Sequence, residues 1–446
     1  MLIEFSVGNF RSFKEPVALS MVATKAVSID ARVDAENVFS ADKNLRLLKS
    51  AVIYGANNSG KSNLIDSLRF MRQWVLRSSR DSQVDEPIPV EPFALSEQTL
   101  NEPSFFEIVF ISQGKQYRYG FRLTSRRVIE EWLYYVPSAR EALLFQRHES
   151  DIRVMSAFRE GKDLSDKTRP NALFLSVVAQ FNGAISGQIL HWFRDLGIIS
   201  GLTDIDRSRT EELLDSPEDH ARLLHLLKIL DLGFDEMRVE QQEAPSTAAM
   251  QERATHVYAT DTGLLRPGKG GKLARPQATL MTVHIRNDGR ETFFDLDKQE
   301  SEGTKKLVAL AGVLLTTLDQ GGILIIDELD GRLHPLLTRR IIQLFHSNTA
   351  NPHNAQLIFA THDTNLLTSR LFRRDQIWFT EKDAEQSTKL YSLVEFKLGG
   401  AKVRNDASFE KDYITGRYGA IPFIGDLREF NSMLKPEGIG DSHGQA

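Results

Sequence analysis

The sequence predicts an α/β protein with a β-rich N-terminal lobe and a helical insertion. From residue 279 onward, short apolar runs such as TVHI, ILII, LIFA and QIWF alternate with segments of helical periodicity. This alternation favours a parallel sheet flanked by helices. Nearer the N-terminus, the apolar run AVIY leads through a Gly-rich loop into NLIDSLRFMRQWVL, whose apolar residues recur at helical spacing. After this helix, SFFEIVF and KQYRYGFRL indicate a β-hairpin.

Composition sets broad limits on this chain of 446 residues. A chain of this length buries roughly three quarters of its unfolded surface, so two or three subdomains are expected. The net charge of -5 and the pI of about 6.2 provide no overall basic field for nucleic acid. The absence of cysteine excludes disulfides and, with no signal-peptide pattern, predicts a cytoplasmic location. The longest apolar runs, 307–315 and 323–326, are shorter than the ~20 residues that span a bilayer, so no membrane contact is expected.

Changes of pattern along the chain predict four segments. The pattern of residues 131–242 is helical, but Pro137, Pro170 and Pro217 interrupt it and exclude a long coiled-coil arm. The expected segments are an N-terminal lobe with a β-subdomain (1–130), a helical insertion with a flexible basic loop (131–278), a C-terminal lobe (279–385), and a final strand and tail (386–446).

The basic loop contains the run RPGKGGKLAR, with cations at Arg266, Lys269, Lys272 and Arg275. A solvated surface loop is the ordinary interpretation of such a run. The alternative is contact with nucleic acid or with a protein partner.

The Gly-rich loop has the form Gly-x-x-x-x-Gly-Lys-Ser, preceded by a strand pattern and followed by a helix pattern. In that context the backbone N–H groups and the helix N-terminus form a cradle for phosphates. Lys61 is expected to reach the β- and γ-phosphates, and the Ser62 hydroxyl to hold Mg²⁺. The candidate nucleotide-binding residues here are Gly55, Asn57, Asn58, Ser59, Gly60, Lys61, Ser62 and Asn63.

Two later apolar runs end in polar side chains. ILII runs directly into Asp327 and Glu328, which are predicted to hold Mg²⁺ and to act as the general base toward water, respectively. Taken alone, this segment could equally be a core strand entering an acidic loop. LIFATH delivers His362 to the carboxyl edge of the same sheet, where it is predicted to sense the γ-phosphate. A merely solvated loop histidine is the alternative.

The segment SEGTKKLVALAGVLLTTL begins with a capping residue and places Leu307, Leu310, Leu314 and Leu318 on one helical face. The simple interpretation is a capped core helix. The alternative is a second phosphate site, offered to a nucleotide bound by another subunit.

In their order along the chain, these motifs resemble the ABC-type ATPase heads related to RecF, the SMC proteins and the OLD nucleases. NFRSF, GANNSGKS, SEGTKKL, IIDELDGRLHP and ATHD stand where those heads have their first strand, Walker A, signature, Walker B with D-loop, and switch histidine. The chain is most similar to the compact ATPases of bacterial abortive-infection and anti-phage systems of the AbiL, RloA and AriA type, over residues 1 to about 425.

This resemblance implies a P-loop NTPase fold of the ABC-head type that uses ATP and Mg²⁺. It implies a homodimer or higher homo-oligomer that sandwiches ATP, with Ser301 and Gly303 capping the γ-phosphate in trans. Two features depart from the family pattern: the signature is SEGT, and Gly331 and Arg332 follow Asp330. Arg11 in NFRSF approaches the phosphates by analogy, although an exposed arginine is the simpler interpretation.

Two functions follow from the resemblance. The first is an ATPase that regulates or scaffolds a separate effector, a nuclease or toxin, in anti-phage defence. The alternative is a DNA-repair ATPase of the RecF and SMC kind, which would contact DNA through the basic loop. A self-contained OLD-type nuclease is disfavoured because only 84 residues follow His362, and they contain no Asp-x-Asp pair for metals.

Overall fold

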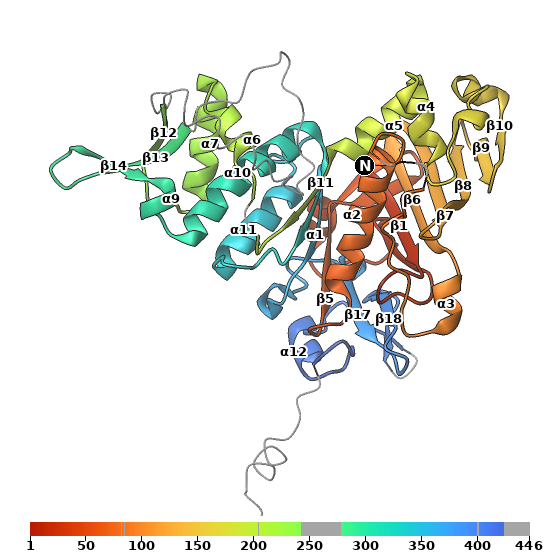
Figure 1. Cartoon of the computed structure of the whole chain (residues 1–446). Coiled ribbons are helices and arrows are strands. Elements are labelled where there is room, and N and C mark those ends of the chain that lie inside the picture. The colour runs from red at the N-terminus through yellow and green to blue at the C-terminus, as the bar shows by residue number, and fades with distance from the viewer. Residues whose placement is uncertain (82, 84, 204, 242–277, 399–400, 423–446) are drawn as a thin grey trace, which may run out of the picture.

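A six-stranded sheet positions the candidate site. The computed structural model describes residues 1–81, 83, 85–203, 205–241, 278–398 and 401–422 (Figure 1). Within these residues the strand order is β11 (Leu196–Ser200), β15 (Ile323–Asp327), β16 (Gln356–Ala360), β5 (Ser50–Gly55), β17 (Ile377–Lys382) and β18 (Thr388–Ser392). The first five strands pair in parallel, and β18 is an antiparallel edge strand. The predicted parallel α/β arrangement is therefore confirmed for ILII, LIFA and QIWF.

A second, antiparallel sheet forms the β-rich lobe. In the described chain its order is β10 (Asp151–Val154), β9 (Ala142–His148), β8 (Val128–Tyr135), β7 (Lys115–Leu123), β6 (Ser104–Ser112), β1 (Leu2–Gly8) and β2 (Val17–Ser20). The hairpin predicted from SFFEIVF and KQYRYGFRL is confirmed as β6 and β7. Both residues of its turn, Gln113 and Gly114, have positive φ, which suits the twist of a tight hairpin.

The helical prediction for residues 131–154 is wrong, because these residues form most of β8 and all of β9 and β10. Helices do follow in the rest of the insertion, but its first part belongs to the antiparallel sheet. The misleading feature is a buried charge. Glu131 is fully buried within β8, where Tyr119 Oη and the backbone N–H groups of Phe174 and Leu175 donate to its carboxylate. A carboxylate at an inward position breaks the apolar alternation by which strands are recognised.

The run TVHI also differs from prediction. It lies in β13 (Ala278–Ile285), which pairs antiparallel with β12 (Glu236–Gln241) and β14 (Glu291–Asp295) and not with the parallel sheet. These three strands project at one end of the molecule, far from the antiparallel lobe (Figure 1). The local turn RNDG joins β13 to β14, and this short-range pairing holds the strand away from the central sheet.

The helices cover both faces of the six-stranded sheet. The helix α2 (Lys61–Arg77) packs between this sheet and β1, and its predicted apolar face is buried. The helix α10 (Glu302–Gln320) lies in a second core with the other face. The remaining helices are α1 (Ala31–Asn37), α3 (Glu97–Asn101), α4 (Phe174–Gln180), α5 (Ala184–Asp195), α6 (Ser208–Leu213), α7 (Pro217–Ile229), α9 (Leu296–Gln299), α11 (Pro335–His346) and α12 (Phe409–Ile414).

Shorter elements complete the described chain. The helix expected near residue 364 is only the single 3-10 turn η3, capped by Asp363. The other 3-10 turns are η1 (Ser156–Gly161), η2 (Ser165–Lys167), η3 (Thr364–Leu366) and η4 (Arg374–Gln376), and the two-stranded pairs are β3 (Val38–Asp42) with β4 (Leu45–Leu48) and β19 (Lys397–Leu398) with β20 (Ala401–Lys402).

Some of the predictions concern residues that the structure leaves undescribed. The basic run Arg266–Arg275 falls within 242–277, and the end of the expected tail lies beyond residue 422, so both are outside the described residues. The proposed division into four segments remains a prediction. In the part of the chain that is described, every helix is too short or too polar to cross a bilayer.

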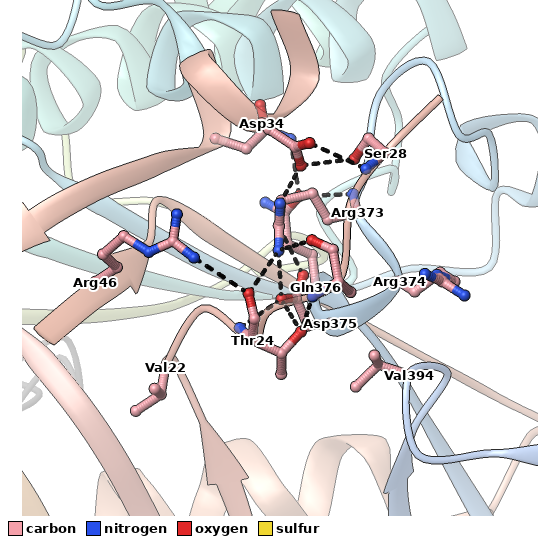
Figure 2. A network of polar contacts seen from close by, with 12 residues as sticks. Val22, Thr24, Ser28, Asp34, Arg46, Arg373, Arg374, Asp375, Gln376 and Val394 are labelled. Carbon is pink, nitrogen blue, oxygen red and sulfur yellow. Dashed lines mark hydrogen bonds and ion pairs between the residues drawn. The ribbon is translucent and has the colours of Figure 1, made fainter. Parts of the chain in front are cut away.

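A buried polar network fastens the N-terminal segment to the end of the six-stranded sheet opposite the Gly-rich loop. Arg373 is 4% exposed and donates from Nε and Nη2 to the carboxylate of Asp375, at 2.9 and 2.8 Å (Figure 2). It also forms an ion pair with Asp34 of α1. The Asp375 carboxylate accepts from the backbone N–H and the hydroxyl of Thr24, both at 2.8 Å. The guanidinium of Arg373 is thus the shared partner of two carboxylates, those of Asp34 and Asp375.

Gln376 extends this network to β5. Its Oε1 accepts from Asn37 Nδ2 at 2.7 Å, and its Nε2 donates to Ser50 Oγ at 2.8 Å. Ser50 is the first residue of the strand that carries the Gly-rich loop. The network therefore joins α1, η4 and β5, which are far apart in the sequence.

Replacing Arg373 tests this network. Arg373→Met leaves the 3% exposed Asp375 without its cation, so the free energy of unfolding should fall by about 3–5 kcal/mol. Arg404→Met is the matched control, because the Arg404 side chain is 81% exposed in its pair with Asp406 and its loss should leave the free energy of unfolding nearly unchanged. Urea unfolding followed by circular dichroism measures both. Equal stability of the two variants would contradict a structural role for the network.

Candidate nucleotide site

The Gly-rich loop stands between the end of β5 and the start of α2, as predicted. Its two glycines are required by the close approach of neighbouring atoms. A Cβ on Gly55 would lie 2.4 Å from Ser59 Oγ and from Thr380 Oγ1. Gly60 has φ 109°, and a Cβ there would lie 2.4 Å from Thr388 Oγ1. Neither position accepts a side chain without a shift of the loop.

Lys61 is the first residue of α2, and it turns back over the loop. The residue is 6% exposed, and its Nζ donates to Gly55 O at 2.8 Å and to Ala56 O at 3.1 Å. Burial lowers its pKa, while the negative charges of Asp327, Glu328 and Asp330 oppose that shift. The predicted phosphate-binding lysine and the predicted acidic pair therefore lie close enough to interact electrostatically.

The acidic pair ends β15. Burial raises the pKa of Asp327, and the neighbouring Ser62 hydroxyl partly opposes this shift. The Asp327 Oδ1 atom is buried and has no hydrogen-bond partner among the described residues. A buried carboxylate oxygen without a partner is costly unless a ligand satisfies it. Ser62 and Asp327 therefore fit the two protein ligands expected of a Mg²⁺ ion.

The described residues contain no cluster of three or more histidine or acidic side chains placed to hold a metal. Mg²⁺ commonly keeps several waters and takes further oxygens from substrate phosphates, so it needs only one or two protein carboxylates. The donor set of one hydroxyl and one carboxylate agrees with such an ion and not with a fully protein-bound metal.

A cavity of about 330 Å³ brings together three segments that are distant in the sequence. The Gly-rich loop forms one side, and Glu328 and His362 approach from the ends of β15 and β16. Glu328 has φ 53° and so stands in a left-handed turn immediately after its strand. His362 is exposed, and its backbone N–H donates to Asp330 Oδ2 at 3.3 Å. The residues that line the cavity are Asn57, Asn58, Ser59, Gly60, Lys61, Ser62, Asn63, Glu328 and His362.

Two threonines outside the sequence motifs, together with Ser12 of NFRSF, support the loop from behind. Thr388, at the start of β18, donates from Oγ1 to Ser59 O at 2.9 Å and lies 2.8 Å from Ser12 Oγ. Thr380 Oγ1 lies 2.6 Å from Ser59 Oγ. Asn63 Nδ2 donates to Ser12 Oγ at 2.8 Å, so this candidate nucleotide-binding residue also contacts the residues that support the loop. No local pattern indicates these threonines, because their contacts with the loop span more than 300 residues of sequence.

Arg11 lies beside the loop helix but already has partners. Its guanidinium forms ion pairs with Asp66 of α2 and with Glu91. Its side chain is 32% exposed, intermediate between the exposed and buried extremes. In the structure Arg11 therefore contacts two carboxylates, those of Asp66 and Glu91.

Ser301 and Gly303 do not line the cavity of the same chain. Ser301 is the N-cap of α10, and its Oγ accepts from Thr304 N at 3.1 Å. Leu307, Leu310, Leu314 and Leu318 are buried, so the interpretation as a capped core helix is confirmed. A role for this helix N-terminus toward a nucleotide held by another copy remains a prediction.

Comparison with known proteins identifies the family. Residues 50–368, more than half of the chain, match the family described as "AAA domain, putative AbiEii toxin, Type IV TA system". Among solved structures, the chain is similar to an SMC head domain from Thermotoga maritima, with 14% sequence identity, coverage of 88% of this chain and 98% of that chain, and a TM-score of 0.39. No curated protein sequence matches the chain. With its Gly-rich loop and acidic strand end in one cavity, the chain belongs to this family of AAA-type P-loop ATPase domains.

Proposed function

We propose that this protein hydrolyses ATP with Mg²⁺ at a site completed by a second copy of the chain, and that it thereby controls a separate effector in anti-phage defence. The observation that carries the proposal is the cavity of about 330 Å³ in which the Gly-rich loop, Glu328 and His362 meet. Membership in an AAA-type ATPase family supports the same chemistry.

The loop side of the cavity suits the binding of a triphosphate. Backbone N–H groups of the loop and the N-terminus of α2 offer partial positive charge, and Lys61 adds a full charge at their centre. A phosphate group that enters the cavity would replace the carbonyls of Gly55 and Ala56 as the hydrogen-bond acceptor of the Lys61 amine. Ser62 and Asp327 would hold Mg²⁺, which neutralises charge on the phosphate oxygens when bound.

The opposite side suits attack by water. Glu328 follows Asp327 directly, and its left-handed backbone turns the side chain to the cavity instead of the sheet face. There its carboxylate would orient a water molecule and accept its proton. His362, which also lines the cavity, would donate a hydrogen bond to the terminal phosphate. Together these groups divide binding and proton transfer between two edges of one cavity.

A second copy of the chain is part of the proposal because the residues predicted to act in trans lie outside this cavity. Ser301 and Gly303 stand at the exposed start of a helix of 19 residues and are absent from the lining of their own chain's cavity. A helix N-terminus with a serine cap binds phosphate well, and a second copy could present it to the open side of the site. We therefore propose a homodimer or higher homo-oligomer around ATP.

The effector role rests on resemblance. The motifs are similar to those of abortive-infection ATPases, and the matching family is described with a toxin–antitoxin system. Both favour a cytoplasmic ATPase whose nucleotide state acts on a nuclease or toxin. Pull-down of the protein with its genetic neighbours, in ATP and in ADP, tests this part. A partner retained in only one nucleotide state supports it, and retention of none contradicts it.

Two substitutions separate binding from hydrolysis. Lys61→Ala should weaken ATP binding by at least about tenfold, because a charged contact to phosphate is lost. Glu328→Gln should keep ATP affinity within about twofold but lower turnover by about 10²–10⁴, because the general base is removed. Fluorescent-nucleotide titration and phosphate release measure the two effects. Normal hydrolysis by Glu328→Gln would disprove the assignment of the base.

Turnover per chain should rise with protein concentration, because a site shared between copies is incomplete in a dilute monomer. Groups supplied in trans can raise phosphoryl-transfer rates by about 10³–10⁵. Phosphate release should be measured over a hundredfold range of protein concentration, with light scattering to follow assembly. Constant turnover per chain, with a monomer at every concentration in ATP, would argue against the shared site.

The residues behind the loop should affect nucleotide affinity. Thr388→Val keeps the shape of a 1% exposed side chain but leaves Ser59 O without its hydrogen-bond donor. An unsatisfied buried acceptor should destabilise this conformation of the loop by about 1–3 kcal/mol. ATP should therefore bind several-fold more weakly. Thr317→Val is the control, since Thr317 Oγ1 donates to Val313 O within α10 and lies outside the cavity. If both variants bind ATP equally well, the support does not shape the loop.

A further inference from the structure

The turn that carries Glu328 adopts a conformation that its own residues disfavour. Both Glu328 and Arg332 have positive φ, 53° and 59°, although neither is glycine. Side chains with a Cβ rarely adopt this region unless surrounding contacts impose it. Within the turn, Gly331 N donates to Glu328 O at 3.0 Å and Leu333 N to Asp330 O at 3.1 Å. Contacts from outside the turn complete its definition.

One external contact comes from the end of β11. Gly201 N donates to Asp327 O at 2.6 Å, and a Cβ on Gly201 would lie 1.9 Å from Glu328 O. The backbone at Gly201 is thus pressed against the peptide of the predicted general base. This contact restricts the backbone of the turn on the side that faces the end of β11.

The strand β16 supplies a second contact, since Leu329 N donates to Ala360 O at 3.1 Å, and α10 supplies a third. Lys306 is 8% exposed, and its Nζ donates to Leu329 O at 3.2 Å and, in a shorter bond, to Gly331 O. Burial lowers its pKa to about 8, so the amine is mostly protonated at neutral pH. Hydrogen bonds from a charged donor are stronger than neutral ones. A single lysine therefore holds two carbonyl groups of the turn between Glu328 and Arg332.

The same helix begins with the residues predicted to meet the second nucleotide. Glu302 forms an ion pair with Arg332 at 3.3 Å, and a Cβ on Gly303 would lie 3.2 Å from Arg332 O. Lys306 lies one helical turn after these residues. The start of α10 and the turn that carries Glu328 are thus in direct contact within one chain, at three successive points.

We propose that Lys306 is a positioning residue that couples the N-terminus of α10 to Glu328. In the assembly of the proposed function, on which this inference rests, the α10 N-terminus of one chain contacts the nucleotide of the other chain. A displacement of α10 on that contact moves the Lys306 amine, and with it the carbonyls that define the turn of Glu328. Each nucleotide site then responds to occupancy of the other through one buried ammonium group.

The first test compares Lys306→Met with Lys306→Arg. Methionine keeps the length and the apolar stem but donates no hydrogen bond, so kcat should fall by at least about tenfold while KM and nucleotide affinity change by less than about twofold. Arginine can donate to both carbonyls and should recover most of the rate. Lys298→Met is the control, because the Lys298 side chain is 79% exposed in its pair with Asp295, and it should behave as the parent.

Three outcomes would overturn the proposal. They are parental kcat in Lys306→Met, loss of nucleotide affinity in proportion to the rate, and a folded Lys306→Arg protein that is as slow as Lys306→Met. Thermal unfolding of each variant shows that it is folded before its rate is compared.

A second readout does not depend on turnover. Amide hydrogen exchange of residues 328–333 should be about tenfold faster in Lys306→Met than in the parent, since two carbonyls of the turn lose their charged donor. Unchanged exchange there would overturn the proposal even if the rate fell. A parent protein that binds ATP without hydrolysing it would instead refute the proposed function, and the exchange measurement would still decide whether Lys306 holds the turn.

Discussion

Parallel hydrogen bonding of β15 and β5 on either side of β16 is the constraint on which the candidate site depends. Because the three strands run in one direction, their carboxyl ends meet at one edge of the sheet. The Gly-rich loop, the Asp327–Glu328 pair and His362 each follow one of these ends directly. No contact between the side chains themselves is needed to bring them together, since the sheet register already does so. The cavity of about 330 Å³ is the result.

Buried polar groups carry out two different tasks around this edge. At the opposite end of the sheet, Arg373, Asp375 and Gln376 satisfy one another and fasten α1 to the start of β5. These contacts are complete, and such networks define one arrangement of a core. At the site edge, Asp327 Oδ1 lacks a partner among the described residues. Buried polar atoms without a partner also occur elsewhere among the described residues. The Asp327 oxygen is the informative one because it is a carboxylate oxygen beside the Gly-rich loop, where a bound cation would satisfy it.

The loop itself depends on more of the chain than its motif suggests. Thr380 and Thr388, on β17 and β18, contact Ser59 from behind, and Thr388 occupies the space beside Gly60. The turn of Glu328 likewise depends on Gly201 from the insertion and Lys306 from α10. The backbone that follows β11 therefore contributes to the candidate site.

The motifs and the elements that carry them could be recognised from the amino-acid sequence. A run of Ile and Leu before Asp327, and an apolar strand before Gly55, are local patterns that follow from burial of a central strand on both faces. For the same reason, the apolar faces of α2 and α10 could be read from their periodicity. Tertiary packing explains why residues 131–135 continue the strand β8, because the carboxylate of Glu131 is stabilised there by Tyr119 and by backbone donors of α4. It also decided the pairing of β13, the threonines behind the loop and the contacts of Lys306. These features consist of hydrogen bonds between residues far apart in the chain, and such bonds leave no periodic signal in the sequence.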